Sequence, residues 1–271
     1  MLKRIYTLII SASLFLVLAT SCGEYQKVLK SSDYEYKYKK AKEYYEKGEY
    51  VRACDLYRDL VNVYRGTSKA DEIYFFYAQS YYESGDYMLA GHWFRTLVNE
   101  YPRSSYRKDA QYMIATCYYD ESPSIRLDQT VTKKAIDAYQ MYVNLFPASD
   151  KVIEANEKID ELHDKLVYKS FLTAKLYYDL ENYKASTIAL ENSLKEYPTS
   201  RYREELMYML LRSKYNLGVR SVENLMEQRL SSALDEYYTF VDSYPESKYR
   251  KIADKYYEEL SKKLDYHNDE I

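Results

Sequence analysis

A five-residue phrase that begins with alanine and ends in two tyrosines recurs along this chain. The copies are AKEYY at Ala41–Tyr45, AQSYY at Ala78–Tyr82, ATCYY at Ala115–Tyr119, AKLYY at Ala174–Tyr178 and ADKYY at Ala253–Tyr257. Self-similarity at spacings of a few tens of residues is typical of repeat solenoids, in which each unit buries its apolar face only against its neighbours. We therefore expect a stack of small units.

A second pattern of mostly apolar residues accompanies the phrases and steps three, four, three and four residues. We call each copy of this pattern a ladder and its five residues the rungs. The five copies are Tyr50, Ala53, Tyr57, Leu60, Tyr64; Tyr87, Ala90, Phe94, Leu97, Tyr101; Thr132, Ala135, Tyr139, Tyr142, Phe146; Tyr183, Ser186, Leu190, Ser193, Tyr197; and Leu230, Ala233, Tyr237, Phe240, Tyr244. This step keeps the side chains on one face of an α-helix. Each unit is therefore predicted to be a pair of helices.

The predicted turns are as regular as the helices. Gly48 and Gly85 lie between periodic runs, where a chain reversal favours a residue that tolerates the left-handed conformation. After the second helix comes an aromatic residue, a proline and a serine two residues further on, at Pro102, Pro147, Pro198 and Pro245. Proline cannot continue a helix, and the serines Ser104, Ser149, Ser200 and Ser247 are placed to cap the next one.

The order of small residue, aromatic, glycine, tyrosine, alanine, aromatic and proline resembles the tetratricopeptide pattern from roughly Asp33 to the C-terminus. The composition agrees, because the 271 residues include six glycines and five prolines and contain no alternating β-branched run of strand length. We expect an all-α tetratricopeptide-repeat solenoid of about five helix pairs. Most of the 37 tyrosines are expected to be structural.

The N-terminus has the composition of an export signal. Lys3 and Arg4 precede an apolar stretch that is too short to span a membrane, and small residues lead to Cys22. The sequence LATSC resembles a bacterial lipobox, although its leucine is four residues before the cysteine instead of three. We expect residues 1–21 to be a lipoprotein signal peptide, Cys22 to be lipidated and residues 22–32 to form a polar tether. The alternative is an ordinary secreted protein with a cysteine at its cleavage site.

The charge of the chain limits its partners. Removal of the signal would take away Lys3 and Arg4 and move the formal net charge by two, from −3 to −5. An acidic chain with no basic stripe argues against nucleic acid and against electrostatic attachment to anionic lipid. We therefore expect membrane attachment through the lipid on Cys22 alone.

No residue pattern points to catalysis, a metal or a cofactor. The three histidines are scattered, and the chain contains no HExxH, CxxC, phosphate-loop or GxSxG pattern. Cys54 and Cys117 fall in different units, beyond the roughly 7 Å reach of a disulfide, and are expected to be two buried thiols. We expect a protein that is not an enzyme.

The register of the repeats predicts a peptide-binding surface. In a tetratricopeptide array the first helix of each pair lines the concave face, and positions three before and four after the small packing alanine point into it. These positions hold Tyr38, Tyr45, Phe75, Tyr82, Tyr112 and Tyr119. Six aromatic side chains on one concavity would suit an extended apolar or aromatic peptide. The alternative is that they only pack between neighbouring helices.

Two irregularities divide the array. The turn between Tyr119 and Thr132 is swollen, and residues 150–180 contain no proline or glycine and keep apolar residues at helical spacing. We expect one extended helix there, joining an N-terminal lobe at 33–149 to a C-terminal lobe at 150–271. A further insertion, Gly218 to Leu230, lengthens the fifth unit.

Taken together, the chain resembles the BamD-type lipoproteins of the outer-membrane β-barrel assembly machine. The resemblance rests on Cys22, the five helix pairs, the Pro-x-Ser turns, the swollen turn ending at Asp128-Gln129-Thr130, and the long connecting helix before AKLYYDLENY. It implies a lipid anchor in the outer membrane facing the periplasm. It also implies binding of C-terminal segments of unfolded barrel proteins by the N-terminal lobe, and docking of the C-terminal lobe on a barrel-shaped, BamA-like insertase. The alternative is a generic cell-envelope tetratricopeptide scaffold lipoprotein.

Overall fold

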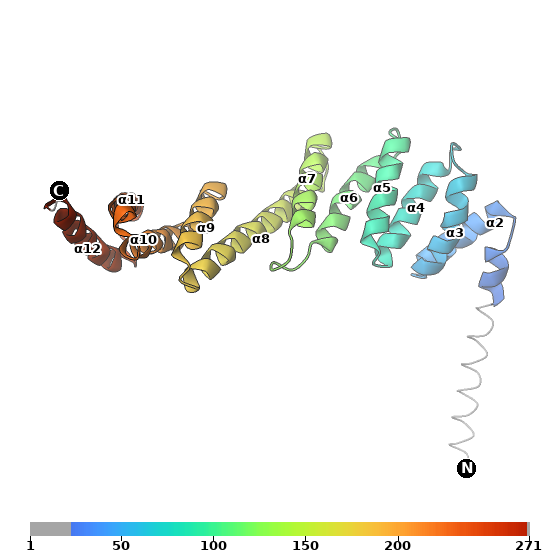
Figure 1. Cartoon of the computed structure of the whole chain (residues 1–271). Coiled ribbons are helices and arrows are strands. Elements are labelled where there is room, and N and C mark those ends of the chain that lie inside the picture. The colour runs from blue at the N-terminus through green and yellow to red at the C-terminus, as the bar shows by residue number, and fades with distance from the viewer. Residues whose placement is uncertain (1–22, 270–271) are drawn as a thin grey trace, which may run out of the picture. The chain divides into compact units, whose positions relative to one another are not determined.

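The computed structural model describes residues 23–269, with side chains described as far as Leu264, and this range holds helices and no strand (Figure 1). Residues 23–29 are helical and precede α2 (Tyr34–Glu46), α3 (Tyr50–Val63), α4 (Ala70–Glu83), α5 (Tyr87–Glu100), α6 (Arg107–Glu121), α7 (Thr130–Leu145), α8 (Val152–Asp179), α9 (Tyr183–Glu196), α10 (Arg203–Val219), α11 (Glu223–Ser243) and α12 (Arg250–Asp269). The predicted all-α repeat fold is confirmed.

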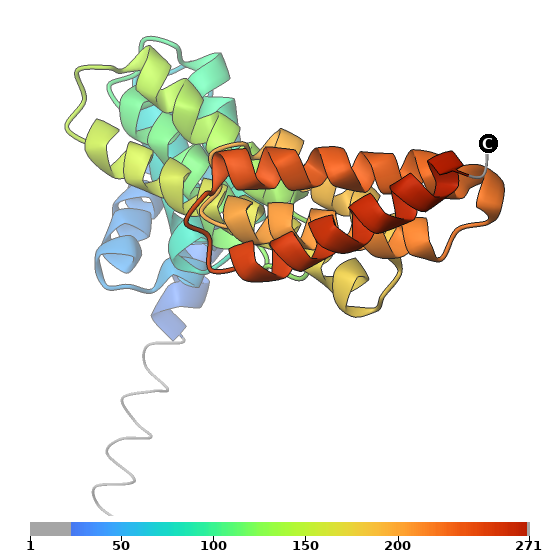
Figure 2. The same cartoon turned by 90° about the vertical axis from the view of Figure 1, so that its left-hand side faces the viewer.

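The helices form successive pairs, α2 with α3, α4 with α5, α6 with α7, α8 with α9 and α10 with α11, and α12 packs against α10 and α11. Figure 2 shows α11 and α12 lying side by side. The fifth copy of the repeated phrase, at Ala253–Tyr257, lies on α12. It therefore follows the last ladder instead of preceding it, and α10 takes the place of the first helix in the fifth pair.

The ladder positions supply the core, as their helical spacing predicts. Within the described chain, the three central rungs of every ladder are at most 7% exposed: Ala53, Tyr57, Leu60; Ala90, Phe94, Leu97; Ala135, Tyr139, Tyr142; Ser186, Leu190, Ser193; and Ala233, Tyr237, Phe240. Each fully buried Leu or Phe side chain stabilises the fold by about 1.5–3 kcal/mol relative to an exposed one. The first of these three rungs is Ala or Ser in every set, and this small side chain lets a neighbouring helix approach closely.

The predicted helix reversals use the left-handed conformation. Gly48 has φ of 77° and Gly85 has φ of 85°. The fourth pair places Glu181 at the equivalent position, two residues before the first rung of its ladder, with φ of 53°. A side chain at such φ costs about 1–2 kcal/mol, so this turn is held by the helices that flank it.

The serines after each proline stabilise the turn ahead of the helix, two positions before the helix cap. The Oγ of Ser104, Ser149, Ser200 and Ser247 accepts a hydrogen bond from the backbone N–H two residues on, at 3.0, 3.3, 3.1 and 3.0 Å. The helices begin three residues after each serine. The expected capping role is therefore corrected to a turn-forming one. The Ser104 and Ser247 hydroxyls also donate to Asp71 and Glu204 of the preceding unit.

The segment expected to be a polar tether is packed on the first repeat over residues 23–29. Tyr25 and Val28, three residues apart on one helical face, are buried, and the Tyr25 hydroxyl donates to Asp55 at 2.7 Å. Lys37, only 3% exposed, donates to the Leu29 carbonyl at 3.0 Å and pairs with Asp59 at 2.6 Å. Burial of these apolar side chains explains the correction. The signal peptide at 1–21 and Cys22 lie outside the described residues.

The expected long helix is α8, and it is shared by two compact units, one ending at Leu162 and the other beginning at His163. The sequence placed this division at residue 150. The difference arises because Ala155 and Leu162, both on α8, are buried in the same cluster as Tyr139 and Tyr142 of the third pair. The first part of α8 therefore completes the N-terminal unit.

The two insertions have different structures. In the swollen turn, the buried Gln129 side chain donates to the carbonyls of Ser124 and Leu127 and accepts from Thr132. The insertion from Gly218 to Leu230 is mostly helix, because α10 continues to Val219 and α11 begins at Glu223. The longer fifth pair is thus built from extra helical turns.

Candidate peptide-binding surface

The six aromatic residues predicted to line a groove come from the first helices of the first three pairs. Tyr38 and Tyr45 lie on α2, Phe75 and Tyr82 on α4, and Tyr112 and Tyr119 on α6. The first four belong to one apolar cluster, whereas Tyr112 and Tyr119 belong to the next cluster along the array. The structure therefore brings together four of the six.

These rings differ in how much of them a ligand could reach. Tyr38 and Tyr112 are only 9% and 6% exposed, whereas the other four are half-buried. The Tyr45 ring lies 5.1 Å from Phe76 of α4, between centroids, and the Phe75 ring stacks on Tyr106 at 4.7 Å. The aromatic residues thus join successive pairs, and a ligand would meet ring edges and hydroxyls.

Lysines cover several of these rings, an arrangement that local sequence reasoning missed. The Lys69 Nζ lies 5.1 Å from the Tyr38 ring centroid. Two lysines of α8 and its leading turn cover α6 in the same way, Lys151 at 4.6 Å from the Tyr112 ring and Lys158 at 4.1 Å from the Tyr119 ring. A cation within about 6 Å of an aromatic face is attracted to the ring. These contacts hold the start of α8 against the third pair.

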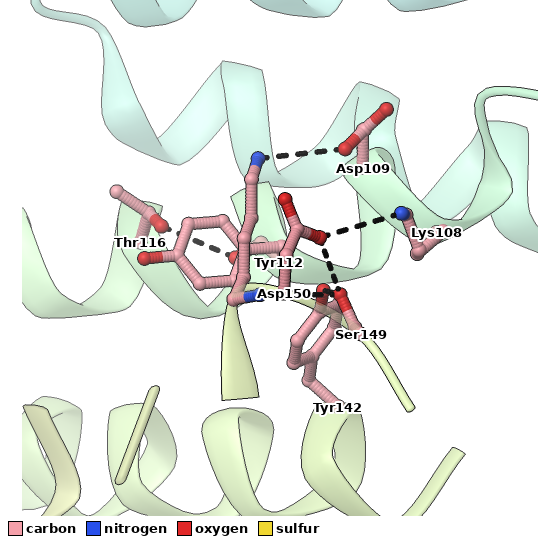
Figure 3. A network of polar contacts seen from close by, with 8 residues as sticks. Lys108, Asp109, Tyr112, Thr116, Tyr142, Ser149 and Asp150 are labelled. Atoms are coloured by element: carbon pink, nitrogen blue, oxygen red, sulfur yellow. Dashed lines mark hydrogen bonds and ion pairs between the residues drawn. The ribbon is translucent and has the colours of Figure 1, made fainter. Parts of the chain in front are cut away.

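A polar network surrounds Tyr112 at the same junction (Figure 3). Lys108 pairs with Asp150 at 3.6 Å, and the hydroxyls of Tyr142 and Ser149 are 2.6 Å apart. The Ser149 hydroxyl also donates to Asp150 at 3.1 Å. The leading turn of α8 is therefore anchored to both helices of the third pair, which fixes the cover over Tyr112.

The hydroxyls of the half-buried tyrosines Tyr82 and Tyr119 donate hydrogen bonds to carboxylates. The Tyr82 hydroxyl donates to Asp120 at 2.8 Å, and the Tyr119 hydroxyl donates to Glu161 at 2.7 Å while it accepts from Lys158 at 2.9 Å. Burial raises the pKa of Tyr45 to about 12, and burial together with the Asp120 bond raises the pKa of Tyr82. All of these hydroxyls stay neutral near pH 7, so the surface offers hydrogen bonds and ring edges.

The remaining sequence predictions concern reactive groups. Cys54 and Cys117 are free and buried, as expected, and burial raises the pKa of both thiols to about 12. Among the side chains of residues 23–264, no cluster of three or more His, Cys, Asp or Glu could hold a metal ion. Within the same range, no helix combines the length and apolar character needed to cross a bilayer.

Comparison with known proteins places the chain in a family. A family model described as "YfiO: Outer membrane lipoprotein" matches residues 31–230 and 170–271, which together include every helix pair. The chain belongs to this family of outer membrane lipoproteins. Its helix pairs and connecting helix α8 are therefore features of a YfiO-type lipoprotein.

Individual relatives of this lipoprotein are distant. It is 27% identical over 92 residues to a Rickettsia prowazekii protein named "Outer membrane protein assembly factor BamD". This match spans 34% of the chain and 37% of the length of that relative.

Two solved structures match much of the chain at low sequence identity. The structure titled "TPR2AB-domain:pHSP90-complex of yeast Sti1" is 14% identical over 85% of the chain and 99% of that structure, with a TM-score of 0.38. The TPR domain of P58(IPK) is 13% identical over 89% of the chain and 68% of that structure, with a TM-score of 0.41. At these scores neither likeness adds to the functional argument.

Proposed function

We propose that this lipoprotein is a lipid-anchored periplasmic scaffold of the machine that assembles β-barrel proteins in the outer membrane. The observation that carries the proposal is the family match, which extends over the whole array of helix pairs. The relative named as an assembly factor supports the same role. In this proposal the chain supplies binding surfaces and performs no catalysis, and its anchor is the lipid on Cys22.

The two compact units take different partners in this proposal. The N-terminal unit binds C-terminal segments of unfolded barrel proteins through the half-buried aromatic residues of α2, α4 and α6. The C-terminal unit docks on a barrel-shaped insertase. Exposed apolar side chains on its helices and on the turn after α8 support a docking role, because such groups favour contact with another protein: Leu176, Leu180, Ile188, Tyr238 and Ile252.

Depletion of the protein tests the assembly role. If the chain serves barrel assembly, its depletion should lower many outer-membrane barrel proteins together, as measured by quantitative proteomics of the isolated membrane. A fall confined to the components of one envelope pathway would refute the proposal and favour a dedicated tetratricopeptide scaffold.

Truncation tests the assignment of the units. A chain that ends at Tyr168 keeps Ala155 and Leu162, which complete the third pair, so the N-terminal unit should stay folded. It should lose co-purification with the insertase and retain capture of barrel-protein C-terminal peptides. Retention of the insertase by this truncated chain would place the docking surface in the N-terminal unit.

Alanine substitutions test the aromatic surface. Tyr45→Ala and Tyr82→Ala should each weaken capture of a labelled barrel C-terminal peptide at least about tenfold, measured well below the melting temperature. The matched control is Tyr44→Ala, because Tyr44 is only 7% exposed and packs edge-on against Tyr25. This control should lower the melting temperature and leave the affinity of the folded protein unchanged. If all three variants bind the peptide with the same affinity, this aromatic surface is not the peptide-binding site.

A further inference from the structure

A groove with a volume of about 780 Å³ opens along α5, α6 and α7 in the N-terminal unit. Its apolar lining consists of Val98 on α5, Ile114 on α6, and Ala138, Met141 and Leu145 on α7. Met141 and Leu145 are 55% and 45% exposed. The volume falls within the range of about 300–1,000 Å³ that is usual for ligand sites. Solvent-exposed apolar side chains at the edge of such a groove favour a partner that covers them.

Three cations line the groove together with the single carboxylate of Asp137. They are Arg95, Arg107 and Lys134, and none of them forms an ion pair with a carboxylate in the part of the chain that the structure describes. Arg95 donates instead to the Tyr118 hydroxyl at 2.9 Å. A chain with a formal charge of −3 thus carries a local excess of positive charge here.

Arg107 is the most informative of the three. Its Nε is buried and has no hydrogen-bond partner among the described residues, and the guanidinium lies 6.0 Å from the Phe146 ring. A buried donor without a partner leaves the guanidinium incompletely satisfied, and charged guanidinium groups form their strongest hydrogen bonds with carboxylates. The groove therefore combines apolar anchors with a guanidinium that forms no ion pair among the described residues.

We infer that this groove binds an acidic amphipathic segment of a partner protein, with apolar side chains on the Met141–Leu145 side and carboxylates on Arg95, Arg107 and Lys134. An amphipathic segment in an apolar groove is a common mode of peptide recognition. Met141 suits this role because its flexible, polarisable side chain adapts to different partners; its sulfur lies 3.5 Å from the Gln111 amide.

This surface is separate from the aromatic surface described above. The groove uses the stripe Arg107, Gln111, Ile114 and Tyr118 of α6, whereas Tyr112 and Tyr119 each follow a member of that stripe by one residue. One residue along an α-helix turns the side chain by about 100°. The inference therefore does not rest on the proposed function, and each can fail without the other.

A set of three labelled peptides tests the charge requirement with the full mature chain. The probe is a fluorescein-labelled amphipathic helix of leucines and glutamates, and the controls replace every glutamate by glutamine or by lysine. Fluorescence anisotropy should show the acidic peptide binding at least about tenfold more tightly than the glutamine peptide, with the difference shrinking as salt is raised. Failure of the acidic peptide to bind, or equal binding of the acidic and lysine peptides, would overturn the inference.

Matched substitutions locate the binding site. Met141→Asp and Lys134→Glu should each weaken binding of the acidic peptide at least about tenfold. The controls are Met88→Asp and Lys133→Glu, which change exposed residues of α5 and α7 outside the groove lining and should leave binding unchanged. Capture of barrel C-terminal peptides should be unaffected by all four. Loss of acidic-peptide binding in the controls, or its retention in both groove variants, would refute the site.

Discussion

The first ladder contains a buried tyrosine, Tyr57, whose hydroxyl has no hydrogen-bond partner among the described residues. Removal of this hydroxyl should stabilise the protein. Tyr57 is completely buried, its hydroxyl oxygen has no hydrogen-bond partner among the described residues, and burial raises its pKa. The equivalent rung of the second ladder is Phe94, which fills the position without a hydroxyl. An unsatisfied buried hydroxyl costs about 1–3 kcal/mol. Removal of the oxygen leaves a cavity of ~15 Å³, which at about 24 cal/mol per Å³ reduces this gain in stability by about 0.4 kcal/mol.

Tyr57→Phe should therefore raise the free energy of unfolding by about 1–2 kcal/mol and the melting temperature by a few degrees. The matched control is Tyr142→Phe, because Tyr142 is equally buried but its hydroxyl lies 2.6 Å from the Ser149 hydroxyl. This control should lose about 0.5–1.5 kcal/mol. Urea unfolding followed by circular dichroism at the helical band measures both. If both variants lose stability alike, the Tyr57 hydroxyl has a partner and the reasoning is wrong.

Three further predictions concern the backbone, the response to pH and the anchor. Gly218→Ala should lower the free energy of unfolding by about 1–2 kcal/mol, because a Cβ there would lie 2.7 Å from Leu230 Cδ2. Gly91→Ala, where the nearest atom to the new Cβ would be 3.4 Å away, should raise it by up to about 1 kcal/mol, and thermal unfolding measures both changes. Stability should fall as pH rises from 10 towards 12, because the folded chain keeps the Tyr45 proton, with its pKa of about 12, that the unfolded chain loses near 10; urea midpoints across this range show the sign. Cys22→Ser should abolish incorporation of a fatty-acid analogue, and persistent labelling would contradict the lipid anchor.

Local periodicity was sufficient to predict the elements of this fold. The spacing of Ala53, Tyr57 and Leu60 identifies the buried face of α3 from sequence because neighbours on a helix are set by steps of three and four residues. Gly48 likewise predicts the position of a reversal because its left-handed conformation disfavours other residues. The turn serines were predicted to cap the next helix but lie two positions before the capping residue, because the sequence pattern shows where a hydroxyl is needed and does not show which backbone N–H it accepts from.

The candidate surfaces depended on contacts between distant segments, and there sequence reasoning was incomplete. It identified Tyr112 and Tyr119 as facing a groove, but Lys151 and Lys158, 39 residues further along in each case, come back to cover both rings. It likewise treated residues 22–32 as a tether, although the Tyr25 hydroxyl donates a hydrogen bond to Asp55.

The sequence by itself determined the repeat fold, the helix faces and the turns, because all three follow from interactions within a few residues of one another. The tertiary structure decided which aromatic rings remain accessible, where α8 is divided between the two units, and that Arg95, Arg107 and Lys134 meet around one apolar groove. These features require residues from different helices to come together. Their positions depend on how the pairs stack, which no periodicity within a single helix records.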